Sequence, residues 1–317
     1  MSALPSVTEP SSEPDRDAAG PIGAPGSATA LAGAAHGGSL DDMPEMLIDA
    51  RLGRRVRGLA ARADLRDGIA LWRLAFTLGW LDIKLRYRGS ALGPLWLTLS
   101  SAVMVGSMGF LYATLFHIGL AEYLPYLALS LILWQAGIGG LAGEACNSFI
   151  DAEQTIRSMR MPFTVQVIRT VVRNVIVLGH NVIVPLVVFA IFGQWPGLAG
   201  FLCLPGLALW LLDGAASCYL LGAICARFRD VPPIIGSLLQ IAYYLTPVIW
   251  KPSQLGARSW WLPINPFDSL LEVVRAPLLG TAPSVFTWVA ALVYSALLCL
   301  VSWRVFVRAR PRIAFWV

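Results

Sequence analysis

The sequence predicts an all-α membrane protein with six transmembrane helices, an N-terminal amphipathic interface helix and an outer re-entrant helical hairpin between spans five and six. Three observations predict this class. Of the 317 residues, 56% are hydrophobic and only 14% are charged, whereas an ordinary soluble domain has about 25% charged residues. The apolar residues gather in six runs of roughly 20 residues, which is the length of a membrane-spanning helix. The arginines fall between these runs, so the net charge of +5 indicates membrane topology and not a nucleic-acid partner.

Residues 1–66 are expected to form a disordered basic cytoplasmic tail. The part up to residue 39 has no hydrophobic periodicity and no aromatic residue, so it cannot bury enough surface to offset the entropy of ordering. A signal peptide is not expected, because a basic start followed by an apolar stretch is missing. The arginine-rich stretch 51–66 is interpreted as a solvated, weakly helical linker, with binding to anionic headgroups as the alternative.

Residues 67–90 are expected to form the amphipathic interface helix. At about 100° per residue, a narrow charged stripe contains Arg73, Lys84 and Arg88. The adjacent arc is mostly aromatic and holds Ile69, Trp72, Phe76, Trp80, Ile83 and Tyr87. The apolar run is too short and too interrupted by charge to span a bilayer. We therefore expect this helix to lie in the cytoplasmic interface, with its aromatic side chains in the headgroup region.

The six predicted spans share uncharged or lightly charged sequences. They cover residues 92–116, 124–146, 165–192, 198–224, 232–250 and 284–305. Basic residues lie before the first span, in the second and fourth connections and after the last span, and the excess of Lys and Arg marks that side as cytoplasmic. We therefore expect a transmembrane domain over residues 91–310, a cytoplasmic C-terminus over residues 311–317, and both termini inside.

The stretch between the last two spans is expected on the outside. Trp260 and Trp261 suit an interfacial anchor. The following sequence, INPFDSLLEVVRAPLLG, predicts a short helix that Asp268 or Ser269 caps and Pro277 ends. An amphipathic hairpin that dips back into the outer leaflet fits this pattern.

The sequence offers little for catalysis. The motif G-x-x-x-x-G-K-[ST] is missing, and the nearest glycine-rich run, GIGGLAGE, has no lysine and lies inside a span, so hydrolysis of nucleotide by this chain is not expected. The three histidines are far apart, and the five cysteines are scattered singly, so neither a metal site nor a cofactor is expected. No carboxylate pair has catalytic spacing. An integral-membrane enzyme of envelope synthesis therefore remains only an alternative.

Two acidic residues fall inside predicted spans. Asp213 is near the middle of the fourth span, and Glu144 is close to the inner end of the second. A charged side chain at the bilayer centre costs at least about 2.5–3.5 kcal/mol, so each is expected to face protein or water. Two interpretations stay open for both residues: a structural hydrogen bond to a neighbouring helix, or the lining of a polar translocation path.

Four stretches of the sequence resemble a known family. They are WLDIKLRYRGSALGPLW (80–96), NSFIDAEQTIRSMRMPF (147–163), RFRDVPPIIGSLLQIAYYLTPVIW (227–250) and INPFDSLLEVVRAPLLG (264–280). Their order and spacing resemble the permease subunit of ABC-2 type exporters for cell-envelope polysaccharides, which handle lipid-linked O-antigen, capsule and teichoic-acid polymers. Pro232, Pro233 and Asp213 depart from the family pattern.

The resemblance implies a homodimer in the bacterial cytoplasmic membrane that exports a lipid-linked polysaccharide. Two copies of a separate ABC-type ATPase, which binds ATP and Mg, would dock on the cytoplasmic side. Residues 153–159 would be the coupling helix. The expected coupling residues are Glu153, Arg157, Arg160, Arg227, Arg229 and Asp230. The stripe of Arg73, Lys84 and Arg88 would face the lipid pyrophosphate, with topology-setting alone as the alternative.

The resemblance also implies that some spans line a channel. Aromatic residues on those spans can stack against sugar rings while their polar edges stay hydrated, and an interfacial aromatic belt is the alternative. The expected channel aromatics are Tyr112, Phe116, Trp134, Tyr243 and Tyr244. A drug or small lipid is the alternative cargo.

Overall fold

Helices form nearly all of the structure, a computed structural model that describes residues 53–88, 93 and 95–317. These residues belong to one unit of the chain, Asp49–Val317, and no strand occurs among them. The segment 1–52 of the expected disordered tail lies outside the described residues.

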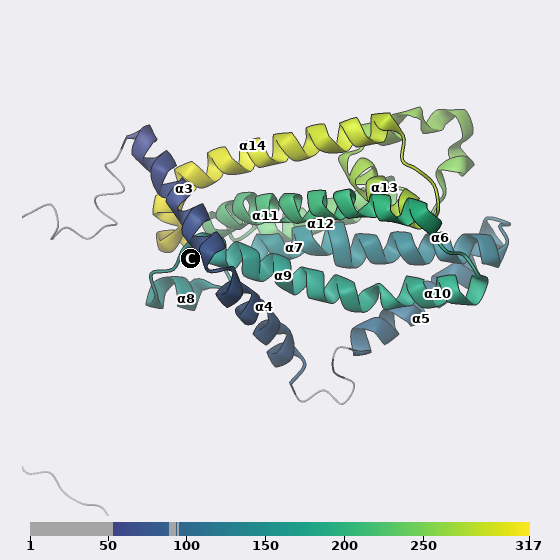
Figure 1. Ribbon diagram of the computed structural model, residues 1–317, viewed down its shortest axis with the longest axis horizontal. Coiled ribbons are helices and arrows are strands. Elements are labelled where there is room, and N and C mark those ends of the chain that lie inside the picture. The colour runs from purple at the N-terminus through teal and green to yellow at the C-terminus, as the bar shows by residue number, and fades with distance from the viewer. Residues whose placement is uncertain (1–52, 89–92, 94) are drawn as a thin grey trace, which may run out of the picture. The chain divides into compact units, whose positions relative to one another are not determined.

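Within the described residues, five helices are long and apolar enough to cross a membrane, which makes the chain a multi-pass membrane protein (Figure 1). They are Leu95–Phe116, Leu120–Asn147, Phe163–Phe192, Gly197–Arg227 and Val285–Trp316. The predicted fifth span is represented by α12 (Val231–Leu245), an apolar helix of 15 residues. It ends there because Pro247 disfavours helical geometry at Thr246, which is extended with φ −87° and ψ 139°.

The candidate spans of the described residues are built from nine elements. They are α5 (Leu95–Leu115), α6 (Leu120–Ile132), the π-helical η3 (Leu133–Ile138), α7 (Gly139–Asn147), α9 (Phe163–Asn181), α10 (Ile183–Phe192), the 3-10 helix η4 (Gly197–Leu202), α11 (Cys203–Arg227) and α14 (Val285–Trp316). The last one differs most from its prediction. The span was expected to end at residue 305, but α14 continues to Trp316 and buries Ile313.

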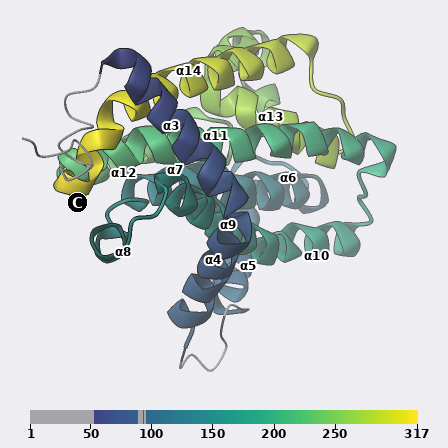
Figure 2. The ribbon, with the colours of Figure 1, turned by 60° about the vertical axis from the view of Figure 1, so that its left-hand side comes forward.

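The N-terminal helix also differs from its prediction. The expected helix over residues 67–90 is divided at Leu71 into α3 (Arg54–Ala70) and α4 (Trp72–Arg86). α3 starts inside the segment predicted as a solvated linker, and it packs against α9 and α14 (Figure 2). Ala61 and Asp64 are buried there. Residues 54–66 are therefore helical and partly packed.

α4 packs on α9 through a narrow face of three buried residues, two of which are small. Ala75, Gly79 and Ile83 are buried, and a Cβ atom at Gly79 would lie 2.9 Å from the backbone oxygen of Arg169. Ile83 was expected in the lipid-facing aromatic arc, but it belongs to this packed face. Trp72, Phe76 and Trp80 of the arc stay exposed.

The packed centre of the molecule is the span Leu120–Asn147. In its apolar window 72% of residues are buried, compared with at most 28% in the other four candidate spans. Its residues Tyr123, Leu127 and Leu131 belong to the main hydrophobic cluster. The remaining spans surround this element and expose apolar side chains, as expected of helices that face lipid.

Two ends of the helical bundle can be distinguished, which we call the α8 end and the α13 end (Figure 1). The α8 end contains the short helix α8 (Glu153–Ser158), residues 227–230 and Val317. The α13 end contains η4 (Gly197–Leu202), the 3-10 segment η5 (Pro252–Ile264) and α13 (Pro266–Leu278).

The cap of α13 differs from the expected one. The side chain of Asn265 accepts a hydrogen bond from the backbone N–H of Phe267 at 3.0 Å, whereas Asp268 and Ser269 are buried one turn further on. Asn265 precedes a proline and is extended, so it lies outside the helix and can cap it. The helix does not stop at Pro277 but runs to Leu278, and Gly280 follows with φ +82°.

Candidate functional site

A cavity of about 460 Å³ brings together four of the five expected channel aromatics. Tyr112 of α5, Trp134 of η3, and Tyr243 and Tyr244 of α12 line it. The ring centroids of Trp134 and Tyr243 are 5.8 Å apart, and those of Tyr243 and Tyr244 are 5.2 Å apart. Phe116 is absent from the lining but stacks on Tyr112 at 5.6 Å. We call this space the aromatic cavity.

The aromatic cavity also has polar groups. The side chains of Gln135 and Gln240 line it, and the hydroxyl of Tyr243 is buried with no hydrogen-bond partner in the described part of the chain. Aromatic faces beside amide and hydroxyl groups can bind a ligand that has both apolar faces and hydroxyls. The two glutamines were not predicted, because each lies next to aromatic or apolar residues in a span and has no motif of its own.

An irregular stretch of helix supplies part of this lining. Trp134 and Gln135 belong to the π-helical η3, where Gly137 has non-helical dihedrals of φ −96° and ψ −105°. A Cβ atom at Gly137 would lie 2.5 Å from the ring of Trp210, so only glycine fits this close approach. Short π-helical segments frequently occur at functional sites.

Asp213 lines a separate groove of about 820 Å³ between α11, α12, α13 and α14. One carboxylate oxygen accepts a hydrogen bond from the hydroxyl of Ser295 at 2.7 Å, and the other is buried with no partner among the described residues. α12 contributes to both spaces, and Leu239 lines each of them. The structural hydrogen bond expected for Asp213 is therefore present, and the residue lies outside the aromatic cavity.

Glu144 belongs to a charge network that joins α4, α7 and α9. Arg173 donates to it at 3.0 Å, and Arg86 lies 3.6 Å away. Arg169 binds both carboxylate oxygens of Asp82 at 2.6 Å, and Asp82 also lies 3.7 Å from Arg173. Glu144 lines neither of the two spaces described above, so the structure favours the structural interpretation of this acid.

The expected pyrophosphate stripe is exposed. Arg73 and Lys84 on α4 and Arg88 just after it face away from the packed side of the helix, and none of the three forms an ion pair within the described residues. Arg86, which the stripe did not include, is the α4 arginine that pairs with Glu144.

At the α8 end, the structure brings together both predicted ATPase contacts. Glu153 of α8 lies 3.0 Å from Arg157 and 3.9 Å from Arg229. The guanidinium of Arg157 donates to the backbone oxygen of Val317 at 3.0 Å, and that of Arg227 lies 5.3 Å from the ring of Trp316. Exposed Arg160 and Asp230 complete the predicted set. Two connections far apart in sequence therefore share one surface.

Asp64 of α3 caps α9 beside this surface. Its carboxylate accepts hydrogen bonds from the backbone N–H groups of Phe163 at 3.1 Å and Thr164 at 3.0 Å, and from Arg310 at 3.2 Å. A carboxylate at a helix N-terminus also interacts favourably with the helix dipole. The cap comes from a residue about 100 positions earlier in the chain, so local sequence rules could not identify it.

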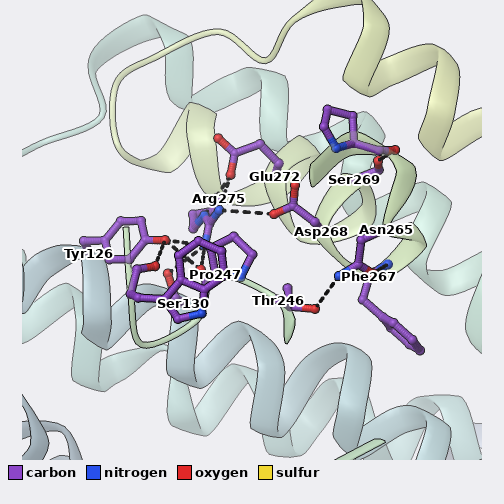
Figure 3. Close-up of polar contacts among 12 residues, drawn as sticks. Tyr126, Ser130, Thr246, Pro247, Asn265, Phe267, Asp268, Ser269, Glu272 and Arg275 are labelled. Atoms are coloured by element: carbon purple, nitrogen blue, oxygen red, sulfur yellow. Dashed lines mark hydrogen bonds and ion pairs between the residues drawn. The ribbon is translucent and has the colours of Figure 1, made fainter. Parts of the chain in front are cut away.

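Arg275 of α13 is the centre of a second polar cluster, at the α13 end (Figure 3). Its guanidinium donates to the hydroxyls of Tyr126 at 2.9 Å and Ser130 at 3.2 Å, to the backbone oxygen of Pro247 and to Glu272 at 2.8 Å. The residue is 1% exposed. It therefore holds the segment after α12 against α6 and α13.

Asp268 lies next to this cluster. One of its oxygens is 3.8 Å from the Arg275 guanidinium. Burial raises the pKa of Asp268 to about 7, although the positive charge of Arg275 lowers it. The sequence suggested Asp268 only as a helix cap and contained no signal for the buried arginine.

The chain was compared with known proteins. No family model matches it. An O-antigen export system permease protein from Myxococcus xanthus is 29% identical over 213 residues, which are 64% of this chain and 79% of the relative. Two permease proteins of O-antigen export systems from Klebsiella pneumoniae are 21% and 20% identical over 63% of this chain and 81% of each relative. The resemblance predicted from the sequence is therefore confirmed, because the chain is similar to three export permeases over about four fifths of their length.

Proposed function

We propose that this chain is the membrane-spanning permease subunit of an ATP-driven ABC-2 exporter, which moves a lipid-linked polysaccharide such as O-antigen outward across the bacterial cytoplasmic membrane. One observation carries the proposal: in a chain similar to O-antigen export permeases, Tyr112, Trp134, Tyr243 and Tyr244 line one cavity between apolar helices. Sugar rings offer apolar faces and hydroxyl edges, and this lining offers the matching aromatic faces and polar groups.

The alternatives have less support. A small apolar drug or lipid would not need the amides of Gln135 and Gln240 in the lining. An enzyme of envelope synthesis would need reactive groups beside the substrate, and the glutamate and aspartate expected inside the spans belong to the charge network and to the separate groove. Permease homologues also favour transport over catalysis.

The permease is proposed to act as a homodimer. α12 has no buried residue among those described, and the exposed large side chains on it include Ile234, Leu238 and Ile241. The aromatic cavity opens along the same helix. A second copy that covers this surface would close the cavity into a channel shared by two chains.

The α8 end is proposed as the docking surface for two copies of an ABC-type ATPase, which would bind ATP and Mg. Support comes from the convergence of Glu153, Arg157 and Arg229 on one surface, since charged groups on an exposed helix allow charge-assisted contacts. This end would then be cytoplasmic, with both termini inside, as the excess of arginine there also favours.

We further propose that the chain crosses the membrane six times. Arg229 contacts Glu153 at the α8 end, and Lys251 contacts Glu122 at the α13 end at 2.7 Å. The segment between them has to connect the two ends. Its helix contributes about 22 Å at 1.5 Å per residue, which is most of the roughly 30 Å of hydrocarbon. Residues 246–250, which form turns and bends, continue from the helix to the α13 end.

Two peripheral elements complete the proposal. α4, with exposed aromatic residues, would lie in the cytoplasmic interface, and α13 would dip into the outer leaflet as a re-entrant hairpin. Arg73, Lys84 and Arg88 would meet the lipid pyrophosphate. Charge reversal at Arg88 separates this role from topology alone, because only the former predicts reduced ATPase stimulation by the lipid-linked substrate.

The export proposal can be tested with Tyr244→Ala. Tyr244 lines the aromatic cavity but is 61% exposed, so its loss should cost little stability. Phe286→Ala is a matched control, because Phe286 is 60% exposed and lines neither cavity. In cells, the Tyr244 variant should place less polymer on the surface and accumulate lipid-linked polymer in the cytoplasm, whereas the control should behave as wild type. Depletion of the whole chain without any such accumulation would contradict the proposed function.

A further inference from the structure

Three arginines from two distant parts of the chain form a pocket at the α8 end. A cavity of about 230 Å³ is lined by Arg57 of α3 and by Trp303, Arg304, Val307 and Arg308 of α14. α3 and α14 are in contact, so the pocket lies in the angle between the two helices. It is separate from the aromatic cavity and from the groove beside Asp213.

The positive charge of this pocket is not balanced by nearby acids. Arg57, Arg304 and Arg308 form no ion pair with any described residue, and Nε of Arg57 is buried without a hydrogen-bond partner in the described ranges. Arg304 and Arg308 are four residues apart on one helix, where like charges repel each other. A buried donor without a partner is costly, so an anion at this position would relieve both effects.

The location of the pocket indicates where such an anion comes from. Towards the α13 end, the face of α14 that carries Arg304 and Arg308 continues through residues at helical spacings of three and four, all about half exposed. They are Val293, Leu297, Leu300 and Val301. An exposed aliphatic stripe on a candidate span faces hydrocarbon. On the same face of α14, Arg304 and Arg308 follow this stripe at the depth where the headgroup region would begin. Trp303 beside the arginines is also typical of that depth.

We propose that Arg57, Arg304 and Arg308 bind the phosphate of an anionic phospholipid in the adjacent leaflet, with its acyl chains along the aliphatic stripe of α14. Guanidinium groups bind phosphate oxygens in a bidentate manner. The lipid would link α3 to the end of α14, close to the Arg310–Asp64 contact. This inference goes beyond the proposed function, because it concerns a bilayer lipid and holds whichever cargo the chain exports.

The test measures lipid retention by the full-length protein. The protein is reconstituted in nanodiscs with equal amounts of phosphatidylglycerol and phosphatidylcholine, extracted in mild detergent and analysed by native mass spectrometry. Wild type should retain phosphatidylglycerol preferentially. Arg304→Gln/Arg308→Gln should lower its retention about thirtyfold, which corresponds to about 2 kcal/mol, or about 1 kcal/mol for each arginine near an anionic surface.

Arg62→Gln is the control that is matched in charge to Arg57→Gln, because each removes one positive charge from α3. Arg62 is exposed on α3 but does not line the pocket, so retention should match wild type. Arg57→Gln provides a second test from the other helix and should also lower retention. Equal retention of both lipids by wild type, an equal loss in the Arg62 variant, or displacement of phosphatidylglycerol by millimolar inorganic phosphate would overturn the proposal.

Discussion

Replacing Arg275 tests how the polar cluster at the α13 end stabilises the fold. Arg275→Leu keeps a side chain that can pack but removes the guanidinium that reaches α6, the segment after α12, and α13 itself. In the wild type the Arg275 guanidinium lies 2.8 Å from the carboxylate of Glu272 and 3.8 Å from that of Asp268. The substitution leaves both carboxylates without this positive charge. The hydroxyl of Ser130 also loses its donor.

The expected magnitude follows from burial. Arg275 is 1% exposed, and removing one partner of a buried ion pair typically costs about 3–5 kcal/mol, because the remaining charge is left uncompensated. Glu272→Gln in the Arg275→Leu background removes part of that charge. The double variant should therefore be more stable than the single Arg275 variant by about 1–2 kcal/mol, which is within the usual range of coupling between contacting residues.

Thermal unfolding of purified protein in one fixed detergent measures the effect. A loss of about 4 kcal/mol should lower Tm by about 8 °C, at roughly 2 °C per kcal/mol for a chain of this size. Arg312→Leu changes an exposed arginine on α14 and should leave Tm nearly unchanged. The reasoning is refuted if Arg275→Leu unfolds at the wild-type temperature, or if Glu272→Gln lowers the stability of the Arg275 variant further.

Three other predictions address single acids. Asp213→Leu should assemble in normal amounts but export less polymer, because the groove loses its carboxylate; normal export would refute a role of Asp213 in transport. Asp64→Ala should lower stability by about 1–2 kcal/mol through loss of the α9 cap, with partial recovery in Asp64→Asn; an unchanged Tm would contradict the capping role. The pKa of Asp268 is raised from 3.8 to about 7, so the folded state holds the proton of this carboxyl group to higher pH than the unfolded state does. The stability that this group contributes therefore falls as the pH rises between these two pKa values. Asp268→Asn should remove that fall, and an unchanged pH profile of Tm would count against it.

Local sequence patterns were sufficient to locate the five candidate spans of the described residues. The run 124–146 and the structure's Leu120–Asn147 nearly coincide, because hydropathy is a property of consecutive residues. A short helix was expected over residues 153–159, and α8 spans Glu153–Ser158. The exceptions were points where the backbone changes geometry within an apolar or periodic stretch, such as Leu71 and Thr246.

Local sequence patterns could not predict which residues far apart in the chain form ion pairs or hydrogen bonds. Asp82 and Arg169 form a bidentate pair only because α4 packs on α9. Glu144 appeared as an isolated intramembrane acid because its partner Arg173 lies in the next span. The four cavity aromatics were found together because the family resemblance supplied the tertiary information, whereas Gln135, which lines the same cavity, carried no such signal.

The distribution of ion pairs separates two kinds of arginine in this chain. Paired arginines such as Arg173 and Arg275 join elements across the bundle, and their charges are already satisfied by acids. Asp213, the acid nearest the middle of a span, has only one donor in the described part of the chain, the hydroxyl of Ser295, since a full ion pair is costly where water is scarce. The arginines of the α3–α14 pocket, by contrast, form no ion pair with an acidic side chain among the described residues. The pairing of an arginine, rather than its presence in the sequence, therefore indicates whether it stabilises the fold or remains available to a lipid.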